Sequence, residues 1–241
     1  MEYSAITDVG LVRTKNQDSY ITIENKYGDL LVLVADGIGG GKAGEVASFE
    51  TIKYFQNAFK ESGPFSDHKS VINYLSYHVN LANKHVHELS EYNEDYRGMG
   101  TTLTGIIIAN NEVVTINVGD SRVYGFVDKT AYTLTKDDTL INQMIESGQI
   151  KAEEAINHPK KHYLVKAIGI FDKVKADVHK VKNMDYYLCC SDGLHGLVSS
   201  EEMVEIIYDD SKSLRKKCLD LKNLAMLKGG YDNITAVLVK M

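Results

Sequence analysis

The sequence has few cysteines and no long apolar run. Its 241 residues include three cysteines, of which Cys189 and Cys190 are adjacent and Cys218 stands alone. Because there is no CxxC pair for zinc or redox chemistry, these thiols are expected to be reduced core residues. No apolar stretch approaches the roughly 18–20 residues of a membrane-spanning helix, and residues 1–10 lack the basic and apolar regions of a signal peptide. We therefore expect a cytoplasmic protein without a membrane partner.

The sequence also has fewer basic residues than acidic ones. The 27 lysines and arginines are outnumbered by 33 aspartates and glutamates, and they are scattered along the chain. A net charge of −6 leaves no electrostatic footprint for nucleic acid, so no nucleic-acid partner is expected. With 44% apolar residues the chain can bury a full core, and its length favours a single domain over residues 1–241. We expect this domain to be a monomer.

Four aspartates lie at or beside the end of a short apolar run. They are Asp36, Asp120, Asp192 and Asp232, and the first and third of these are followed directly by glycine. An ionised carboxylate beside apolar surface needs a counter-charge or a full set of hydrogen bonds. Hard divalent cations prefer oxygen ligands and can bridge shared carboxylates. The four strand ends therefore predict one magnesium or manganese site.

Apolar periodicity predicts a buried strand followed by two helices. The continuous apolar run at 30–35 is typical of a strand that is buried on both faces. Helical spacing of apolar residues follows at about 43–61 and again around 71–89, and either Ser66 or Asp67 could cap the second helix. Such a hairpin of amphipathic helices must lay its apolar face on a sheet.

The middle and the end of the chain complete an α+β pattern. Alternating strands flank the dipeptides at 110–111 and 128–129, which suit tight hairpins and indicate antiparallel sheets. A polar excursion with short helices at about 138–165 is interpreted as a flap. Two further helices are expected near 200–209 and 212–227. The economical architecture is a four-layer αββα sandwich of two mainly antiparallel sheets flanked by helix pairs.

Six segments carry a family resemblance: VRTKNQDSY, ADGIGGGKAGEVAS, GMGTTLTG, NVGDSR, CSDGL and GGYDNIT. In this order, over nearly the whole chain, they resemble the metal-dependent serine/threonine protein phosphatases of the PPM or type 2C family, and above all the compact bacterial members. The resemblance implies the same αββα sandwich. It also implies hydrolysis of phosphoserine and phosphothreonine in proteins, without a phosphoenzyme, in opposition to a serine/threonine kinase.

The resemblance further implies a role for each site residue. Asp36 would bridge two Mn²⁺ or Mg²⁺ ions, Asp192 and Asp232 would complete one of them, and the backbone carbonyl of Gly37 would ligate the other. Two such ions activate a water molecule for in-line attack on phosphorus. Asp18 would bind metal-coordinated water, which makes it the fourth catalytic aspartate.

Three other positions follow from the same resemblance. Asp120 and Asp192 would hold a third, weaker ion near the flap. The planar guanidinium of Arg13 would bind the substrate phosphate through two oxygens. Ile38 stands where the animal and plant enzymes usually carry a histidine that is a proposed general acid, so leaving-group protonation must come from another donor.

Alternative interpretations remain open for several of these residues. Asp18 and Asp120 could each cap a turn, and Arg13 could form a surface ion pair. The spacing G-x-G-x-x-G at 39–44 matches a dinucleotide-binding turn, but the acidic residue at the end of a second parallel strand is missing. His195 is expected to be a packing or exposed residue. A phosphoprotein-binding module of the same fold without turnover is the alternative function.

Overall fold

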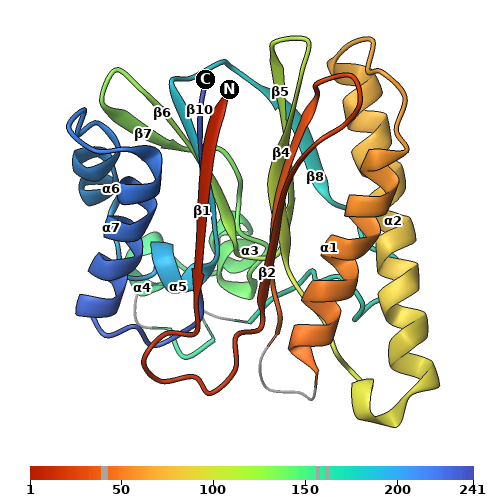
Figure 1. The fold of residues 1–241 in the computed structure, drawn as a ribbon. Helices are drawn as coiled ribbons and strands as arrows, with labels where there is room; N and C mark the ends of the chain where they lie inside the picture. Colours follow the sequence, from red (N-terminus) through yellow and green to blue (C-terminus); the bar gives the residue numbers. More distant parts are fainter. Residues whose placement is uncertain (39–42, 156–157, 161–162) are drawn as a thin grey trace.

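The chain forms two five-stranded sheets that pack face to face (Figure 1). In spatial order the first sheet consists of β1 (Glu2–Asp8), β10 (Ile234–Lys240), β9 (Tyr186–Cys190), β6 (Arg122–Val127) and β7 (Thr130–Thr133). The second consists of β2 (Asp18–Glu24), β3 (Leu30–Asp36), β4 (Leu103–Ala109), β5 (Glu112–Val118) and β8 (Asp177–Val181). All these strands pair antiparallel. The computed structural model describes residues 1–38, 43–155, 158–160 and 163–241.

Helix pairs cover the two outer faces. The second sheet carries α1 (Gly44–Lys60) and α2 (His68–Tyr92), and the first carries α6 (Ser200–Ile207) and α7 (Leu214–Leu227) (Figure 1). Short helices lie elsewhere: η1 (Glu94–Tyr96), α3 (Leu140–Glu146), α4 (Ala152–Ala155) and α5 (Asp192–His195). The αββα sandwich that the sequence predicts is therefore confirmed. In the described part of the chain, no helix has the length and apolarity needed to cross a membrane.

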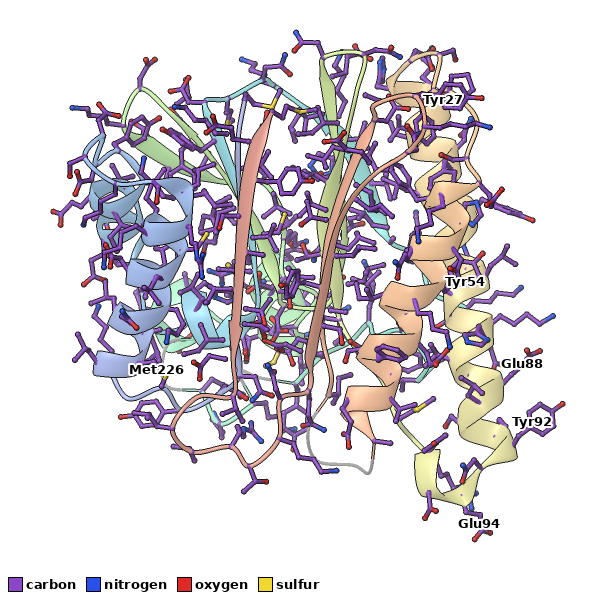
Figure 2. All side chains as sticks on the ribbon, viewed as in Figure 1. Tyr27, Tyr54, Glu88, Tyr92, Glu94 and Met226 are labelled. Carbon is purple, nitrogen blue, oxygen red and sulfur yellow. The ribbon has the colours of Figure 1, made fainter. Side chains whose placement is uncertain are left out.

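Strand β3 shows how the four layers are held together. Its residues from Leu30 to Ala35 are fully buried, as the continuous apolar run predicts. Because successive side chains of a strand point to opposite faces, Leu31 and Leu33 pack under α1 and α2, whereas Val32 and Val34 pack between the sheets. Figure 2 shows side chains filling the space between the sheets. The first polar residue of this strand is Asp36, at its end.

The local signals in the sequence explain several boundaries. The dipeptides at 110–111 and 128–129 have φ of 51°, 58°, 51° and 55°, and they form the β4–β5 and β6–β7 hairpins as predicted. Of the two candidate caps for α2, the structure uses Asp67, whose carboxylate accepts a hydrogen bond from the Ser70 amide at 2.9 Å. All three cysteines are free and buried, in agreement with their expected role as core residues.

The excursion at 138–165 lies between β7 and β8 and contains α3 and α4. Its two ends are tied together, because the Val165 amide donates to the Asp138 carbonyl at 2.8 Å and Lys166 Nζ lies 2.7 Å from the Asp138 carboxylate. Positions 156–157 and 161–162 of this segment are outside the described residues. Its behaviour as a flap stays a prediction.

The glycine-rich stretch at 39–44 lies mostly outside the described residues, since only 43–44 belong to the described part. The strand that follows it in the sheet, β4, pairs antiparallel with β3. A dinucleotide-binding unit needs a parallel strand at this point. The fold therefore provides no support for that alternative.

Candidate active site

The strand register brings the predicted aspartates to one end of the sheets, the lower end in Figure 1. Asp18 at the start of β2 lies directly opposite Asp36 at the end of β3. Asp192 follows β9, Asp232 precedes β10, and Asp120 lies between β5 and β6. Burial, followed by the charges of the other four aspartates, raises the pKa of Asp36 well above its usual range. Carboxylates contributed by distant parts of the chain thus share one site.

The acidic site is electrostatically costly by itself. Burial is the main cause that raises the pKa of Asp18 to about 7, and burial together with the charge of Asp192 raises that of Asp120 to about 7. Asp18 Oδ2 accepts a hydrogen bond from Ser191 Oγ at 2.7 Å, but Asp18 Oδ1 is buried and has no hydrogen-bond partner among the described residues. An unsatisfied buried oxygen beside other carboxylates fits a site that takes a cation or its coordinated water.

The acidic side chains of the described residues are not yet arranged as the ligands of one metal ion. Among residues 1–38, 43–155, 158–160 and 163–241, no three His, Cys, Asp or Glu side chains form a group that could hold a metal ion as they stand. Asp232 is instead paired with Arg13, whose Nη2 donates to Asp232 Oδ2 at 2.7 Å. The ion pair that was the alternative interpretation of Arg13 is thus present, and its partner is a predicted metal ligand. The guanidinium supplies a counter-charge to the acidic site.

Gly37 lies where the chain has no room for a side chain. A Cβ at this position would lie 2.3 Å from the Gly44 carbonyl oxygen and 2.8 Å from that of Gln17. The Gly37 amide also donates to the Gln17 carbonyl at 3.0 Å. The start of α1 and the β1–β2 loop can therefore approach the end of β3 closely only because residue 37 is glycine. Its role as a carbonyl ligand stays a prediction.

Two threonines hold the backbone of Asp36, and no role was predicted for either. Thr102 Oγ1 accepts a hydrogen bond from the Asp36 amide at 2.9 Å, and its own amide donates to the Asp36 carbonyl at 2.8 Å. Thr101 Oγ1 donates to the same carbonyl, also at 2.8 Å. The signal in the sequence is the pair of hydroxyl residues directly before an apolar strand in GMGTTLTG.

Asn233 organises the β1–β2 loop, which carries Arg13. The buried Asn233 side chain accepts from the Gln17 amide at 2.8 Å and donates to the carbonyls of Val9 and Lys15, each at 2.9 Å. One amide side chain thus makes three hydrogen bonds across the loop. Its only sequence signal is an asparagine directly after Asp232 at the start of a strand.

His195 is a packing residue, the first of the two expected alternatives. Its Nε2 lies 2.9 Å from the Asp120 backbone carbonyl, so the ring donates this hydrogen bond. Burial is the main cause that lowers the pKa of His195 to about 4, and the ring is therefore neutral at neutral pH. It fixes the turn from which the Asp120 side chain extends.

The aspartates open into a cleft of about 820 Å³. The lining includes four of the predicted aspartates and Arg13: Arg13, Asp36, Asp120, Asp192 and Asp232. Arg13 is the one cationic residue among the described lining residues. Ile38 also faces this cleft, so the position of the missing histidine is next to the acidic groups.

The chain is similar to known protein phosphatases in both sequence and fold. A family model for protein phosphatase 2C matches residues 12–226. The serine/threonine phosphatase stp of Listeria welshimeri is 38% identical over 236 residues, covering 97% of this chain and 93% of that protein. The structure of the S. agalactiae serine/threonine phosphatase has a TM-score of 0.94 at 33% identity and covers 100% of this chain and 99% of that one.

A third relative has been solved with metal. The catalytic domain of the serine threonine protein phosphatase PstP, in complex with two manganese ions, has a TM-score of 0.84 at 33% identity and covers 99% of this chain and 97% of that one. These similarities span almost the whole sequence and confirm the resemblance carried by the six segments. The chain therefore belongs to the protein phosphatase 2C family of serine/threonine phosphatases.

Proposed function

We propose that this phosphatase hydrolyses phosphoserine and phosphothreonine in proteins by means of divalent cations held by Asp36, Asp192, Asp232 and the Gly37 carbonyl. The observation that carries the proposal is the gathering of five aspartates at one end of the sheets, four of them lining one cleft, where burial and mutual repulsion raise the pKa of Asp36. At neutral pH the mutual repulsion of these buried carboxylates is best offset by bound cations. The relative that was solved with two manganese ions supports the same assignment.

The residues of the chain have distinct parts in this reaction. Bound divalent cations supply an attacking water of lowered pKa and neutralise charge on the phosphoryl oxygens. The backbone of Asp36 is held at both its amide and its carbonyl by Thr102. Asp18 Oδ1, the oxygen without a partner among the described residues, would accept a hydrogen bond from metal-coordinated water.

Arg13 would bind the phosphoryl group. Its guanidinium lies in the acidic cleft and is paired with Asp232, with both side chains partly exposed. An exposed pair of this kind is worth only about 0–1 kcal/mol, so a phosphate dianion can compete for the guanidinium. The Ile38 side chain has no ionisable proton, so the leaving alkoxide would take its proton from metal-bound water or another donor.

We also propose a third metal site and a cellular setting for this phosphatase. Asp120 and Asp192 would hold a third ion, a placement supported by the effect of the Asp192 charge on the pKa of Asp120. Either Mn²⁺ or Mg²⁺ suits an all-oxygen ligand set. We further propose a single catalytic domain over 1–241 with a flap at 138–165, acting as a monomer in the cytoplasm on substrates of a serine/threonine kinase.

Hydrolysis of a phosphothreonine peptide tests this function. Wild-type protein with added Mn²⁺ should release phosphate, and a chelator should abolish the release. The substitution Asp192→Ala should lower turnover by at least ~100-fold. Turnover without metal would overturn the proposal. Peptide binding without phosphate release would instead support the alternative of a non-catalytic phosphoprotein-binding module.

A further inference from the structure

The acidic cleft has apolar rims. Ile170 and Phe171 line it on the segment after the flap, and Tyr231 lines it directly beside Asp232. The Phe171 side chain is 46% exposed and that of Tyr231 is 63% exposed. Scattered exposed apolar residues need no explanation, but two exposed aromatic rings that line one functional cleft indicate a binding surface.

Phe171 lies on a segment that is held in place by hydrogen bonds from α2 and from Thr101. The buried side chain of Asn83 on α2 donates to the Phe171 carbonyl and accepts from the Gly169 amide, both at 2.8 Å. The neighbouring Ile168 exchanges two backbone hydrogen bonds with Thr101, at 3.1 and 2.9 Å. The exposed ring of Phe171 is therefore presented by an ordered backbone, which reduces the entropy that a ligand must overcome on binding.

Tyr231 is held by a close contact with the chain just before it. A Cβ at Gly229 would lie 2.3 Å from Cζ of the Tyr231 ring, so the ring rests directly on the Gly229 backbone. The φ of Gly229 is 126°, which also favours glycine. The next residue, Gly230, accepts a hydrogen bond from the Leu11 amide at 2.8 Å. This second exposed ring thus also has a defined position.

The size and charge of the cleft indicate what these rims bind. A volume of about 820 Å³ lies in the ~300–1,000 Å³ range of sites that enclose a drug-sized ligand, so there is room for residues beside the phosphorylated one. Four aspartates and one arginine line the cleft. An apolar neighbour in the substrate would bury surface against the rings. An acidic neighbour would lose hydration there without a cationic side chain to pair with among the described lining residues, because Arg13 is used by the phosphate.

We propose that Phe171 and Tyr231 form an apolar clamp for a hydrophobic side chain within two positions of the phosphorylated serine or threonine. The clamp selects phosphopeptides with such a neighbour over those with an acidic one. This inference rests on the proposed function, because the phosphate must enter the acidic end of the same cleft. It specifies the class of substrate that the protein dephosphorylates most efficiently.

Phosphothreonine peptides with a single varied neighbour test the clamp. Leucine or aspartate is placed in turn at each of the two positions on either side of the phosphothreonine, in an otherwise neutral polar peptide. With added Mn²⁺, wild type should prefer leucine by about tenfold in kcat/KM for at least one position. The double variant Phe171→Ala/Tyr231→Ala should hydrolyse the leucine and aspartate peptides with similar kcat/KM.

Matched controls come from exposed rings away from the cleft. Phe49 on α1 is 56% exposed and Tyr77 on α2 is 63% exposed, so Phe49→Ala and Tyr77→Ala remove similar rings. These variants should keep the preference for leucine. Equal kcat/KM for all peptides with wild type, or a preference that persists in the double variant, would overturn the clamp while leaving the hydrolase function intact. Failure of wild type to hydrolyse any peptide would overturn both proposals.

Discussion

Asp18 is a buried acid directly opposite a second acid, Asp36. Its pKa is raised to about 7, mainly by burial, against an unfolded value of about 3.9. The folded protein therefore holds a proton that the unfolded chain has released between about pH 4 and pH 7. The associated stability is fully present below about pH 4 and is lost as the pH rises through about 7.

Replacement of Asp18 should reveal this pH dependence. In the presence of a chelator, Asp18→Asn should raise the free energy of unfolding at about pH 7.5 by about 1–3 kcal/mol, because the amide never acquires a charge. The difference from wild type should shrink at about pH 5. Urea denaturation at the two pH values measures it. A variant that is no more stable than wild type at the higher pH would contradict the raised pKa.

Arg13 has two candidate partners, Asp232 and the substrate phosphate. Arg13→Ala should raise KM for phosphopeptide by about tenfold or more, because a charge-assisted bidentate contact to phosphate is lost. Mn²⁺ binding should be retained or become a few-fold tighter, since Asp232 is released from a competing ion pair. Steady-state kinetics and calorimetry measure the two effects. Loss of Mn²⁺ binding would show that the guanidinium supports the metal site instead.

His195 acts through the turn that carries Asp120. His195→Ala removes the hydrogen bond to the Asp120 carbonyl and should lower kcat by about tenfold with little change in KM. His195→Gln places an amide donor near the same carbonyl and should restore most of the activity. The wild-type rate should show no ionisation of His195 between about pH 6 and pH 8, because its pKa is about 4. Full activity of the alanine variant would exclude this positioning role.

The sequence predicted the roles of some site residues but not of others. The strand-end aspartates were recognisable because a carboxylate at the end of an apolar run is chemically unusual. Asp18 came only from the family resemblance. Thr102 and Asn233 were missed because their partners lie far away in the chain, 66 and 216 residues distant.

Secondary-structure elements were predicted wherever their signals are local. The hairpin dipeptides and the caps determine their turns and helix ends within a few residues, and the structure uses them as expected. Strand order is different, because β10 pairs with β1 from the opposite end of the chain. No local pattern specifies such a pairing, so the order of elements predicted two antiparallel sheets but not which strands are neighbours in them.

The α2 cap offers a test at the level of one element. Asp67→Ala removes the acceptor of the Ser70 amide and should lower the free energy of unfolding by about 1 kcal/mol. Because this cap lies at the end of α2 remote from the acidic cleft, kcat and KM should stay at wild-type values. Chemical denaturation and peptide hydrolysis check the two statements. A changed KM would indicate that α2 controls the cleft.

At the scale of the whole molecule, three hydrophobic layers hold four layers of secondary structure together. Adjacent residues of one strand serve different layers, as Cys189 packs between the sheets and Cys190 packs under α6 and α7. The same sandwich aligns the ends of β3 and β9 with the start of β10, and so brings Asp36, Asp192 and Asp232 to one edge of the sheets. Sequence periodicity predicted buried strands, but only the assembled sheets show which carboxylates meet.

Titration of the metal-free protein with Mn²⁺ tests the central claim that these carboxylates form a cation site. Calorimetry at about pH 7.5 in two buffers of different ionisation enthalpy should show saturable binding of at least two ions per chain. It should also show proton release, because carboxylates with raised pKa values must lose protons when they bind a cation. Asp36→Asn should abolish the tight binding. Absence of saturable binding to wild type, or binding that Asp36→Asn leaves unchanged, would contradict the account.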